Sequence, residues 1–379
     1  MLLELTPDQE LFRDATVRFL EDQAPVGELR RLRDDPTGYR PEYWSRGAEL
    51  GWTSLLVPED LGGGNLSGRP VVDASLLAFE FGRHAAPGPL VATNVVAAAL
   101  GTAGGDGHAA LLAELVAGTT VVTWAYGEPN PANRIGDVSL SIRLDGGDIV
   151  LNGIKRPVES AASAGALLVT GRTGDGLTQV LVPTATPGVS LEPLHTVDLT
   201  RRFATVRFDD VRLPVGAVIG GIGDAAAMVE HQLRLAVVMS SAEAVGGMQA
   251  AFDMTVAWAF DRYSFGRSLA SYQALKHRFA DMKSWLEASH AVCERAAEAV
   301  DAHDPDADEL VSAAKAYIGE YGIDLVQDCV QLHGGIGVTF EHDLHLFLRR
   351  VTLNRALWGT PSEHRQRITA RLERSEGAA

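Results

Sequence analysis

A short segment between two helical stretches carries residue types that could grip a ligand. It reads RYSFGRSLASYQALKHRFADM and begins at Arg262. A guanidinium group donates hydrogen bonds in a planar fork, and the ring of Phe265 offers a flat apolar face. Gly266 lets the backbone turn and come close to a bound molecule. The structural alternative is a tight turn between helices that Phe265 merely packs.

A second motif, QLHGG at residues 331–335, also follows a helical stretch. Gly334 and Gly335 would let backbone amides approach an anionic group. Its alternative is again a helix-to-helix turn, packed by Ile336. A third glycine-rich run, GGIGDA at residues 220–225, lacks the strand-helix-strand context of a dinucleotide fold. We interpret that run as a joint between a strand and a helix.

The period of the apolar residues changes along the chain, and this change defines the elements that must position the motifs. Residues 6–118 repeat apolar side chains at helical spacing, whereas residues 119–216 form short β-rich runs separated by Gly, Asp and Pro. Residues 225–262 contain no proline and are apolar nearly all round, which predicts one long helix between other helices. Further helices are predicted over residues 272–300, 307–332 and 343–356.

These patterns predict an α+β protein of three domains. We expect an N-terminal helical domain at residues 1–118 and a middle antiparallel sheet or barrel at residues 119–221. Residues 222–379 are expected to form a helical bundle. A chain of 379 residues exceeds the usual span of one hydrophobic core, which also favours two or three domains.

The charge balance limits the kinds of partner. The chain has 49 acidic and 33 basic residues, a formal net charge of −16, which argues against nucleic acid or an anionic membrane as the main partner. Cys293 and Cys329 have neither CxxC spacing nor a neighbouring His cluster, so no disulfide framework or zinc site is predicted. A reducing, cytoplasmic compartment fits this usage. The start of the chain predicts a capped helix rather than an export signal, with Thr6 as N-cap and Gln9 closing a capping box.

The order of the regions, together with the two motifs, resembles the acyl-CoA dehydrogenase family of flavoproteins. The resemblance covers essentially the whole chain and includes VPEDLGGG near Val57, AYGEP at residues 125–129 and LNGIKR at residues 151–156. It implies the family fold, with a C-terminal four-helix bundle. It also implies FAD, an acyl-CoA substrate, an acceptor similar to electron-transfer flavoprotein, and either a homo-oligomer or a heterotetramer with a related subunit.

The resemblance assigns FAD contacts to individual positions. In the family the arginine and phenylalanine of the first motif contact FAD, and the second motif reaches FAD from a neighbouring subunit. The pattern is incomplete in the middle domain, where Gly127 replaces a frequent threonine. Pro157, Val158 and Glu159 stand where the family often has a Trp and a small hydroxyl residue. The FAD-binding residues implied by the resemblance are Arg262, Phe265, Gln273, Gln331, Leu332, Gly334, Gly335, Tyr126, Val158 and Thr360.

The usual catalytic carboxylate of the family is missing. Many members carry it as a glutamate shortly after the second motif, and the matching run here is ALWGT, with Trp358 at that position. The backbone N–H of Trp358 could still polarise a thioester carbonyl. The indole side chain of Trp358 could narrow the acyl pocket or simply pack. Other members place the glutamate on the long helix, where Ala236 stands here. The nearest candidate base is Glu243, two turns or about 10 Å further along, and its alternative is a structural carboxylate paired with an arginine.

Three functions therefore remain open. The first is an acyl-CoA dehydrogenase that forms a 2,3-enoyl-CoA with an unconventional base. The second is a base-deficient, FAD-binding subunit that works with a related catalytic chain, because losing general base catalysis typically costs about 10²–10⁴-fold in rate. The third keeps the fold and the flavin but performs another flavin oxidation.

Overall fold

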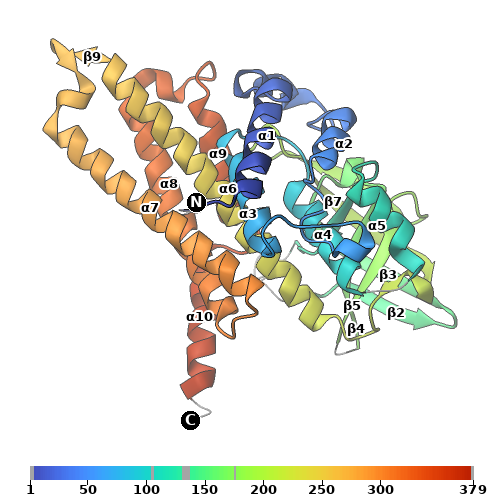
Figure 1. Cartoon of the computed structure of the whole chain (residues 1–379). Helices are drawn as coiled ribbons and strands as arrows, with labels where there is room; N and C mark the ends of the chain where they lie inside the picture. Colours follow the sequence, from blue (N-terminus) through green and yellow to red (C-terminus); the bar gives the residue numbers. More distant parts are fainter. Residues whose placement is uncertain (1–3, 104–105, 130–136, 175, 377–379) are drawn as a thin grey trace.

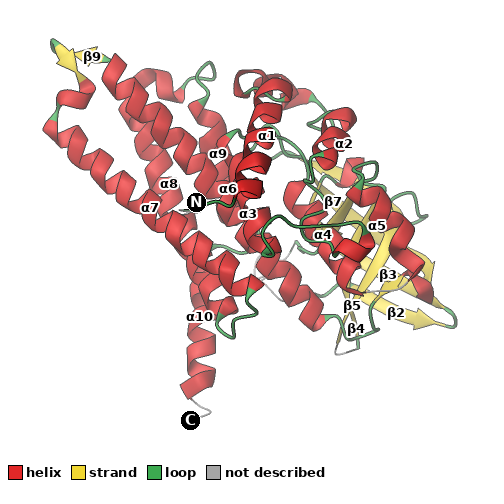
Figure 2. Cartoon of the chain, in the orientation of Figure 1, coloured by secondary structure: helices red, strands yellow, loops and turns green. Residues whose placement is uncertain are grey.

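The computed structural model describes residues 4–103, 106–129, 137–174 and 176–376. Figure 1 shows long helices on one side of the molecule and the sheet on the other, with shorter N-terminal helices between them. Figure 2 shows the same division, since the main sheet occupies one side. The predicted fold class is confirmed, and we propose the domain boundaries at 118/119 and 221/222 because they fall between these groups of elements.

The N-terminal region is helical, as its period predicts. Its helices are α1 (Pro7–Gln23), α2 (Pro41–Glu49), α3 (Pro70–Arg83), α4 (Leu90–Ala103) and α5 (Ala109–Val116), with a 3₁₀ segment η1 (Val26–Asp34). The capping box of α1 is present, since Thr6 accepts from the Gln9 amide and Gln9 accepts from the Thr6 amide. Helices α3 and α4 are buried on nearly all sides, which explains their almost continuous apolar sequence.

The middle region forms one eight-stranded sheet with the order β6-β7-β3-β2-β4-β5-β8, and β1 pairs with β4. The predicted antiparallel pairing holds for most neighbouring strands, but the sheet is mixed, because β1 and β2 each pair with β4 in parallel. Parallel pairs join segments distant in sequence, so strand patterns alone do not reveal them. The strands are β1 (Val122–Ala125), β2 (Ser141–Asp145), β3 (Asp148–Glu159), β4 (Ala166–Thr173), β5 (Gly176–Pro183), β6 (Val189–Leu194), β7 (Phe203–Pro214) and β8 (Val218–Ile219).

The C-terminal region is a bundle built around α6. The run at residues 220–225 is the joint between β8 and α6, as interpreted from the sequence. Residues 361–376, for which no helix was predicted, form α10. The elements are α6 (Ala226–Asp261), a hairpin β9–β10 (Tyr263–Ser264 and Arg267–Ser268), α7 (Gln273–Asp301), α8 (Ala307–His333), a 3₁₀ segment η7 (Gly334–Val338), α9 (Leu344–Ala356) and α10 (Pro361–Glu376).

Helix α6 is long and apolar enough to span a membrane by length and composition, but 89% of its most apolar window is buried inside the protein. Its close crossing with α3 depends on glycine. A Cβ on Gly82 would lie 1.9 Å from the backbone oxygen of Glu243, and one on Gly246 would lie 2.0 Å from that of Phe79. The two backbones therefore touch, which fixes the position of Glu243 in the centre of the protein.

Candidate functional site

The first motif forms a β-hairpin and not a simple turn between helices. Helix α6 ends at Asp261, β9 and β10 pair in antiparallel fashion, and Phe265 and Gly266 make the two-residue turn with φ of 50° and 80°. Two positive φ values are typical of a type I′ hairpin turn, which favours glycine. Phe265 is 97% exposed, so its side chain packs nothing in this chain. Gln273, at the start of α7, is also exposed.

An aromatic stack joins the two motifs. The Arg262 guanidinium lies 5.8 Å from the ring centroid of Trp258, and Trp258 stacks on His333 at 5.3 Å with an interplanar angle of 18°. The hairpin and the end of α8 therefore lie at the same end of the bundle, far from the main sheet (Figure 1). Within the described part of the chain, Arg262 has no ion pair.

The second motif leaves open space around its glycines. Gly334 ends α8 with φ of 65° and ψ of −141°, a conformation that favours glycine. A Cβ on Gly334 or Gly335 would meet no atom within 4 Å. Gln331 is exposed and Leu332 half-buried on the last turn of α8. The predicted residues of both motifs are thus brought together on one accessible end of the bundle.

Trp358 lies at the other side of the protein, against the sheet. Its ring stacks on Trp124 of β1 at 5.4 Å and 15°, and Trp124 in turn contacts Tyr126 at 4.7 Å. Trp358 has φ of 58°, and its carbonyl oxygen accepts from Nε2 of His364, 3.0 Å away. Burial lowers the pKa of His364 to about 3, so that ring is neutral. The backbone N–H of Trp358 donates to no acceptor among the described residues, which leaves this amide available to a ligand.

Glu243 is buried in a network of charged groups. Its Oε1 accepts from Arg350 at 2.7 Å, and its Oε2 accepts from Arg201 at 3.0 Å and from Asn354 at 2.8 Å. Arg201 also holds both carboxylate oxygens of Glu159, each at 2.6 Å. This arrangement is the structural alternative stated for Glu243. The other position for a base, Ala236, is buried and has no acid group.

Arg350 is the centre of this network. Its guanidinium donates to Asp198 at 2.5 Å, to Thr200 at 2.6 Å, to Glu243, and to the carbonyl oxygens of Ala85 and Ala86. Burial alone would lower the pKa of Arg350, but the adjacent Asp198 and Glu243 raise it. Conversely, burial would raise the pKa of Asp198, and Arg350 holds it below its usual value. The charged forms therefore stabilise one another.

Two further buried lysines lie near these groups, and neither was predicted from the sequence. Lys155 of LNGIKR donates to Glu128 of AYGEP at 2.6 Å, so the two weaker motifs meet as an ion pair. Burial lowers the pKa of Lys155 to about 8, and Glu128 opposes this change. Among the described residues, Lys315 of α8 donates to the carbonyl oxygen of Asn354, and burial lowers its pKa to about 7. For Lys315 the available signal was a charged residue within a largely apolar helical run, and for Lys155 it was the LNGIKR motif of β3.

Comparisons with known proteins identify the family. The acyl-CoA dehydrogenase N-terminal domain matches residues 6–118, and the acyl-CoA dehydrogenase C-terminal domain matches residues 223–373. The chain belongs to the acyl-CoA dehydrogenase family. This membership confirms the predicted family and confirms FAD as the cofactor, because the family consists of FAD-dependent oxidoreductases.

Individual relatives agree over the full length. Acyl-CoA dehydrogenase IpdE2 of Mycolicibacterium smegmatis is 28% identical over 97% of this chain and 100% of its own. The solved structure described as a variant of the Tcur3481-Tcur3483 steroid ACAD is 27% identical, with a TM-score of 0.87 over 98% of both chains. A glutaryl-CoA dehydrogenase of Mycobacterium smegmatis in complex with FADH2 shares the fold, at 23% identity and a TM-score of 0.87 over 97% of this chain and 95% of its own.

The residues at the hairpin end of this acyl-CoA dehydrogenase fit the nucleotide part of FAD. Arg262 is a cation without an acid partner in the described chain, Phe265 is an uncovered aromatic ring, and both glycines face open space. A pyrophosphate needs donors and positive charge, and an exposed ring can pack against a planar group.

The other predicted FAD contacts, two in the middle domain and Thr360 before α10, fit the cofactor less well. Val158 is fully buried by the protein itself. The Thr360 amide and hydroxyl both donate to Glu363 at 2.7 Å, as the N-terminal cap of α10. Tyr126 is half-buried and packs on Trp124. In this chain the nucleotide half of the predicted site is accessible, while Val158 of the middle region and Thr360 before α10 are committed to the protein itself.

Proposed function

We propose that this chain serves the FAD-dependent α,β-desaturation of an acyl-CoA thioester. The observation that carries the proposal is the hairpin end, where Arg262 has no acid partner in the described chain and the two glycines of the second motif face open space. Arg262 would hold the pyrophosphate, Phe265 would pack on a ring of the dinucleotide, and the amides near Gly334 and Gly335 would donate to it. When bound, FAD supplies the hydride acceptor of the oxidation.

We further propose that the hairpin serves an FAD shared with a neighbouring subunit. The hairpin lies at the opposite end of the molecule from the main sheet (Figure 1), to which β1 and β3 belong, so one chain cannot place both half-sites on one cofactor. The functional enzyme is therefore an oligomer. Where a thioester lies near α10, the free Trp358 N–H would donate to its carbonyl oxygen in the manner of an oxyanion hole.

The proposed reaction is tested with purified enzyme, a panel of acyl-CoAs and an artificial electron acceptor. The panel includes straight-chain, branched and steroid-derived acyl groups, the last because one solved relative is described as a steroid enzyme. The expected product is an enoyl-CoA that has lost two hydrogens, detected by mass spectrometry. An FAD-loaded enzyme that desaturates no acyl-CoA but oxidises a different class of substrate would overturn the proposal.

A specific observation favours a second function, that of a base-deficient, FAD-binding subunit in a heteromeric dehydrogenase. Each carboxylate of the central network, Glu243, Glu159 and Asp198, is already bound to a guanidinium group. A general base needs a lone pair facing the substrate, and the acceptors of Glu243 are occupied. One solved relative, whose name joins Tcur3481 with Tcur3483, lends support to a two-component enzyme. We therefore propose a structural role for Glu243.

Co-expression separates the two functions. The chain is produced alone and together with a related dehydrogenase-like chain encoded beside it, and both preparations are assayed for enoyl-CoA formation. Activity that appears only in the co-purified pair supports the second function. Full activity of the chain alone supports the first, with a base on this chain.

Either function requires an electron acceptor and a cellular compartment. We propose that the electrons pass to an acceptor similar to electron-transfer flavoprotein, and that the enzyme works in the cytoplasm. Electron transfer to a purified flavoprotein acceptor, followed by its reduction, would test the first of these. Fractionation of cells that produce the chain would test the second.

A further inference from the structure

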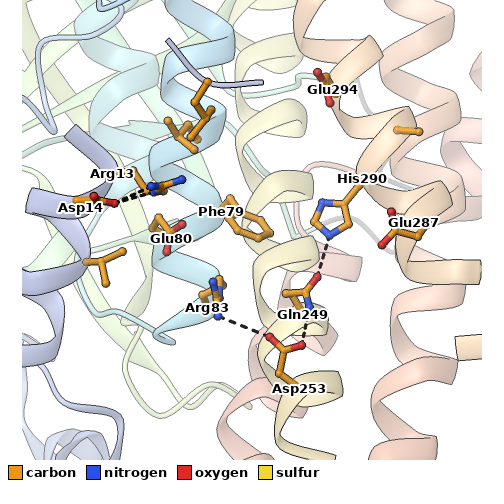
Figure 3. A pocket seen from close by; sticks show the side chains of 14 residues that line it. Arg13, Asp14, Phe79, Glu80, Arg83, Gln249, Asp253, Glu287, His290 and Glu294 are labelled. Carbon is orange, nitrogen blue, oxygen red and sulfur yellow. Dashed lines mark hydrogen bonds and ion pairs between the residues drawn. The ribbon is translucent and has the colours of Figure 1, made fainter. Parts of the chain in front are cut away.

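A pocket of about 680 Å³ lies between α1, α3, α6 and α7, far from the hairpin and unrelated to the flavin motifs. Figure 3 shows its lining, with Glu80 and Phe79 from α3 on one side and His290 and Glu294 from α7 on the other. Volumes of this size hold small organic ligands. The acid and base groups of the lining determine which kind of ligand fits.

Most charged groups around the pocket are paired. Arg13 binds Asp14 at 2.8 Å, Arg83 lies 3.6 Å from Asp253, and Glu287 binds Lys283 at 2.5 Å. These pairs cancel in charge. Among the pocket residues that the structure describes, Glu80 and Glu294 are the carboxylates with no lysine or arginine within ion-pair distance, and a histidine lies beside Glu80. Arg13 and Arg83 act on Glu80, and Arg69 on Glu294, only from further away.

Glu80 is only 3% exposed, and its carboxylate accepts no hydrogen bond from the described residues. His84 lies 3.8 Å away, but its Nδ1 is bonded to the Glu80 carbonyl oxygen, and burial lowers the pKa of His84. Burial correspondingly raises the pKa of Glu80. A buried carboxyl group without a partner is costly, and each such group requires an explanation.

His290 has a second buried hydrogen-bond acceptor that lacks a donor among the described residues. Gln249 donates through its amide nitrogen to Asp253 at 2.7 Å, so the Gln249 oxygen faces His290. That oxygen can only accept, so Nε2 of His290, 3.1 Å away, carries the hydrogen. In the neutral ring, Nδ1 is then an acceptor, and it is buried without a donor among the described residues. Burial lowers the pKa of His290 to about 4, which agrees with a neutral ring.

Between these two groups lies an apolar surface. Phe79 directly precedes Glu80 on α3, and the centroid of its ring lies 5.5 Å from that of the His290 ring. Glu294 follows His290 by one helical turn on α7, so these two acceptors share a face. The pocket thus offers an acceptor group at each side and an aromatic surface between them (Figure 3).

We propose that this pocket binds an aliphatic diamine or polyamine, with one ammonium group at Glu80 and another at Glu294 and Nδ1 of His290. Two ammonium groups match the two unpaired carboxylates, and their N–H bonds supply the donors that all three acceptors lack. The methylene chain lies against Phe79. The site is independent of the proposed dehydrogenase function.

The test is calorimetric titration of the full chain with putrescine, compared with butylamine and butanol. Putrescine is expected to bind saturably and at least about tenfold more tightly than butylamine, because it makes a second charge-assisted contact. Butanol is expected not to bind. Equal binding of putrescine and butanol, or no binding of putrescine at concentrations of about 10 mM, a weak-affinity limit, would overturn the proposal.

Variants locate the site. Glu80→Gln keeps the shape but removes the charge, and His290→Phe keeps the ring contact but removes the acceptor; each is expected to weaken putrescine binding at least about tenfold. Exposed Glu59→Gln serves as the matched control and should bind as the wild type does. Glu80→Gln should melt no lower than the wild type, because it removes an unpaired buried carboxylate. Unchanged putrescine affinity in both site variants would contradict the assignment.

Discussion

Arg262 and Arg350 belong to the same bundle and meet opposite surroundings. Arg350 is fully buried, and its guanidinium is bound to two carboxylates, a hydroxyl and two carbonyl oxygens. Arg262 is exposed, and its guanidinium lies over the face of Trp258 with no hydrogen bond or ion pair among the described residues. Where the protein supplies every partner, a charged group holds the fold together; where it supplies none, the group remains available for a ligand. This contrast separates the structural charges from the candidate FAD contacts.

The largest expected effect is a loss of stability when the buried Arg350 is replaced. Arg350→Met should lower the free energy of unfolding by about 3–5 kcal/mol, because it leaves Asp198 and Glu243 as uncompensated buried charges. Urea denaturation measures the change. The neighbouring Arg349→Met is the control, since Arg349 makes one hydrogen bond to the Val197 carbonyl and should cost less than about 1.5 kcal/mol. Similar losses in both variants would refute the structural role of the network.

Replacing the exposed Arg262 should weaken FAD binding and leave the stability of the fold unchanged. Arg262→Gln should weaken FAD binding by the assembled enzyme about tenfold to a hundredfold, because a charge-assisted hydrogen bond is lost. Its unfolding free energy should change by no more than about 0.5 kcal/mol. Arg267→Gln on the same hairpin is the control, as its guanidinium lies 3.8 Å from the Tyr272 ring. FAD retained equally by both variants would exclude Arg262 from the site.

The buried Lys315 tests the same contrast through the pH dependence of the free energy of unfolding. The pKa of Lys315 falls from 10.5 to about 7 on folding, so the unfolded chain binds this proton more tightly. Between these values stability should rise with pH, by about 1 kcal/mol per pH unit, and below about pH 7 this contribution should level off. Comparing unfolding of the wild type and Lys315→Met across pH isolates this group. A difference that stays constant with pH would show that Lys315 remains charged when folded.

The smallest expected effect concerns the exposed ring. Phe265→Ala should change the unfolding free energy by less than about 0.5 kcal/mol, because the ring touches nothing in this chain. Phe81→Ala is the matched comparison and should cost about 3–5 kcal/mol, since Phe81 is fully buried. Thermal or urea unfolding checks both. A large loss for Phe265→Ala would mean that the ring packs a structural interface.

The long helices were predictable because their apolar period and caps are local signals. The predicted helix over residues 225–262 corresponds to α6, and Thr6 and Gln9 form the predicted cap. Helix α10 was missed although Thr360 and Glu363 form a capping box before it, a local signal of the same kind as Thr6 and Gln9. Its strongly charged sequence has few apolar residues to mark a buried face. The parallel pairing of β1 with β4 is set by tertiary contacts that alternation along a strand does not encode.

The motifs of the candidate site could be located from sequence, but the environment of each residue could not. Glu243 meets Arg201 and Arg350, which are 42 and 107 positions away, so no local pattern reveals that its acceptors are occupied. The hairpin geometry of Phe265 likewise depends on β9 pairing with β10. The distinction between a paired and a free charge is a tertiary property, and it decides between the catalytic and the structural interpretation.

The most direct test of the structural role of Glu243 is an anaerobic titration of the chain, purified alone and loaded with FAD, with the acyl-CoA panel. The visible absorbance of the flavin reports hydride transfer. Because the central carboxylates are paired with arginines, we predict that the flavin stays oxidised with every acyl-CoA, and that it bleaches once a related subunit is added. Bleaching in the chain alone, lost on Glu243→Gln, would contradict this prediction and place the base on this chain.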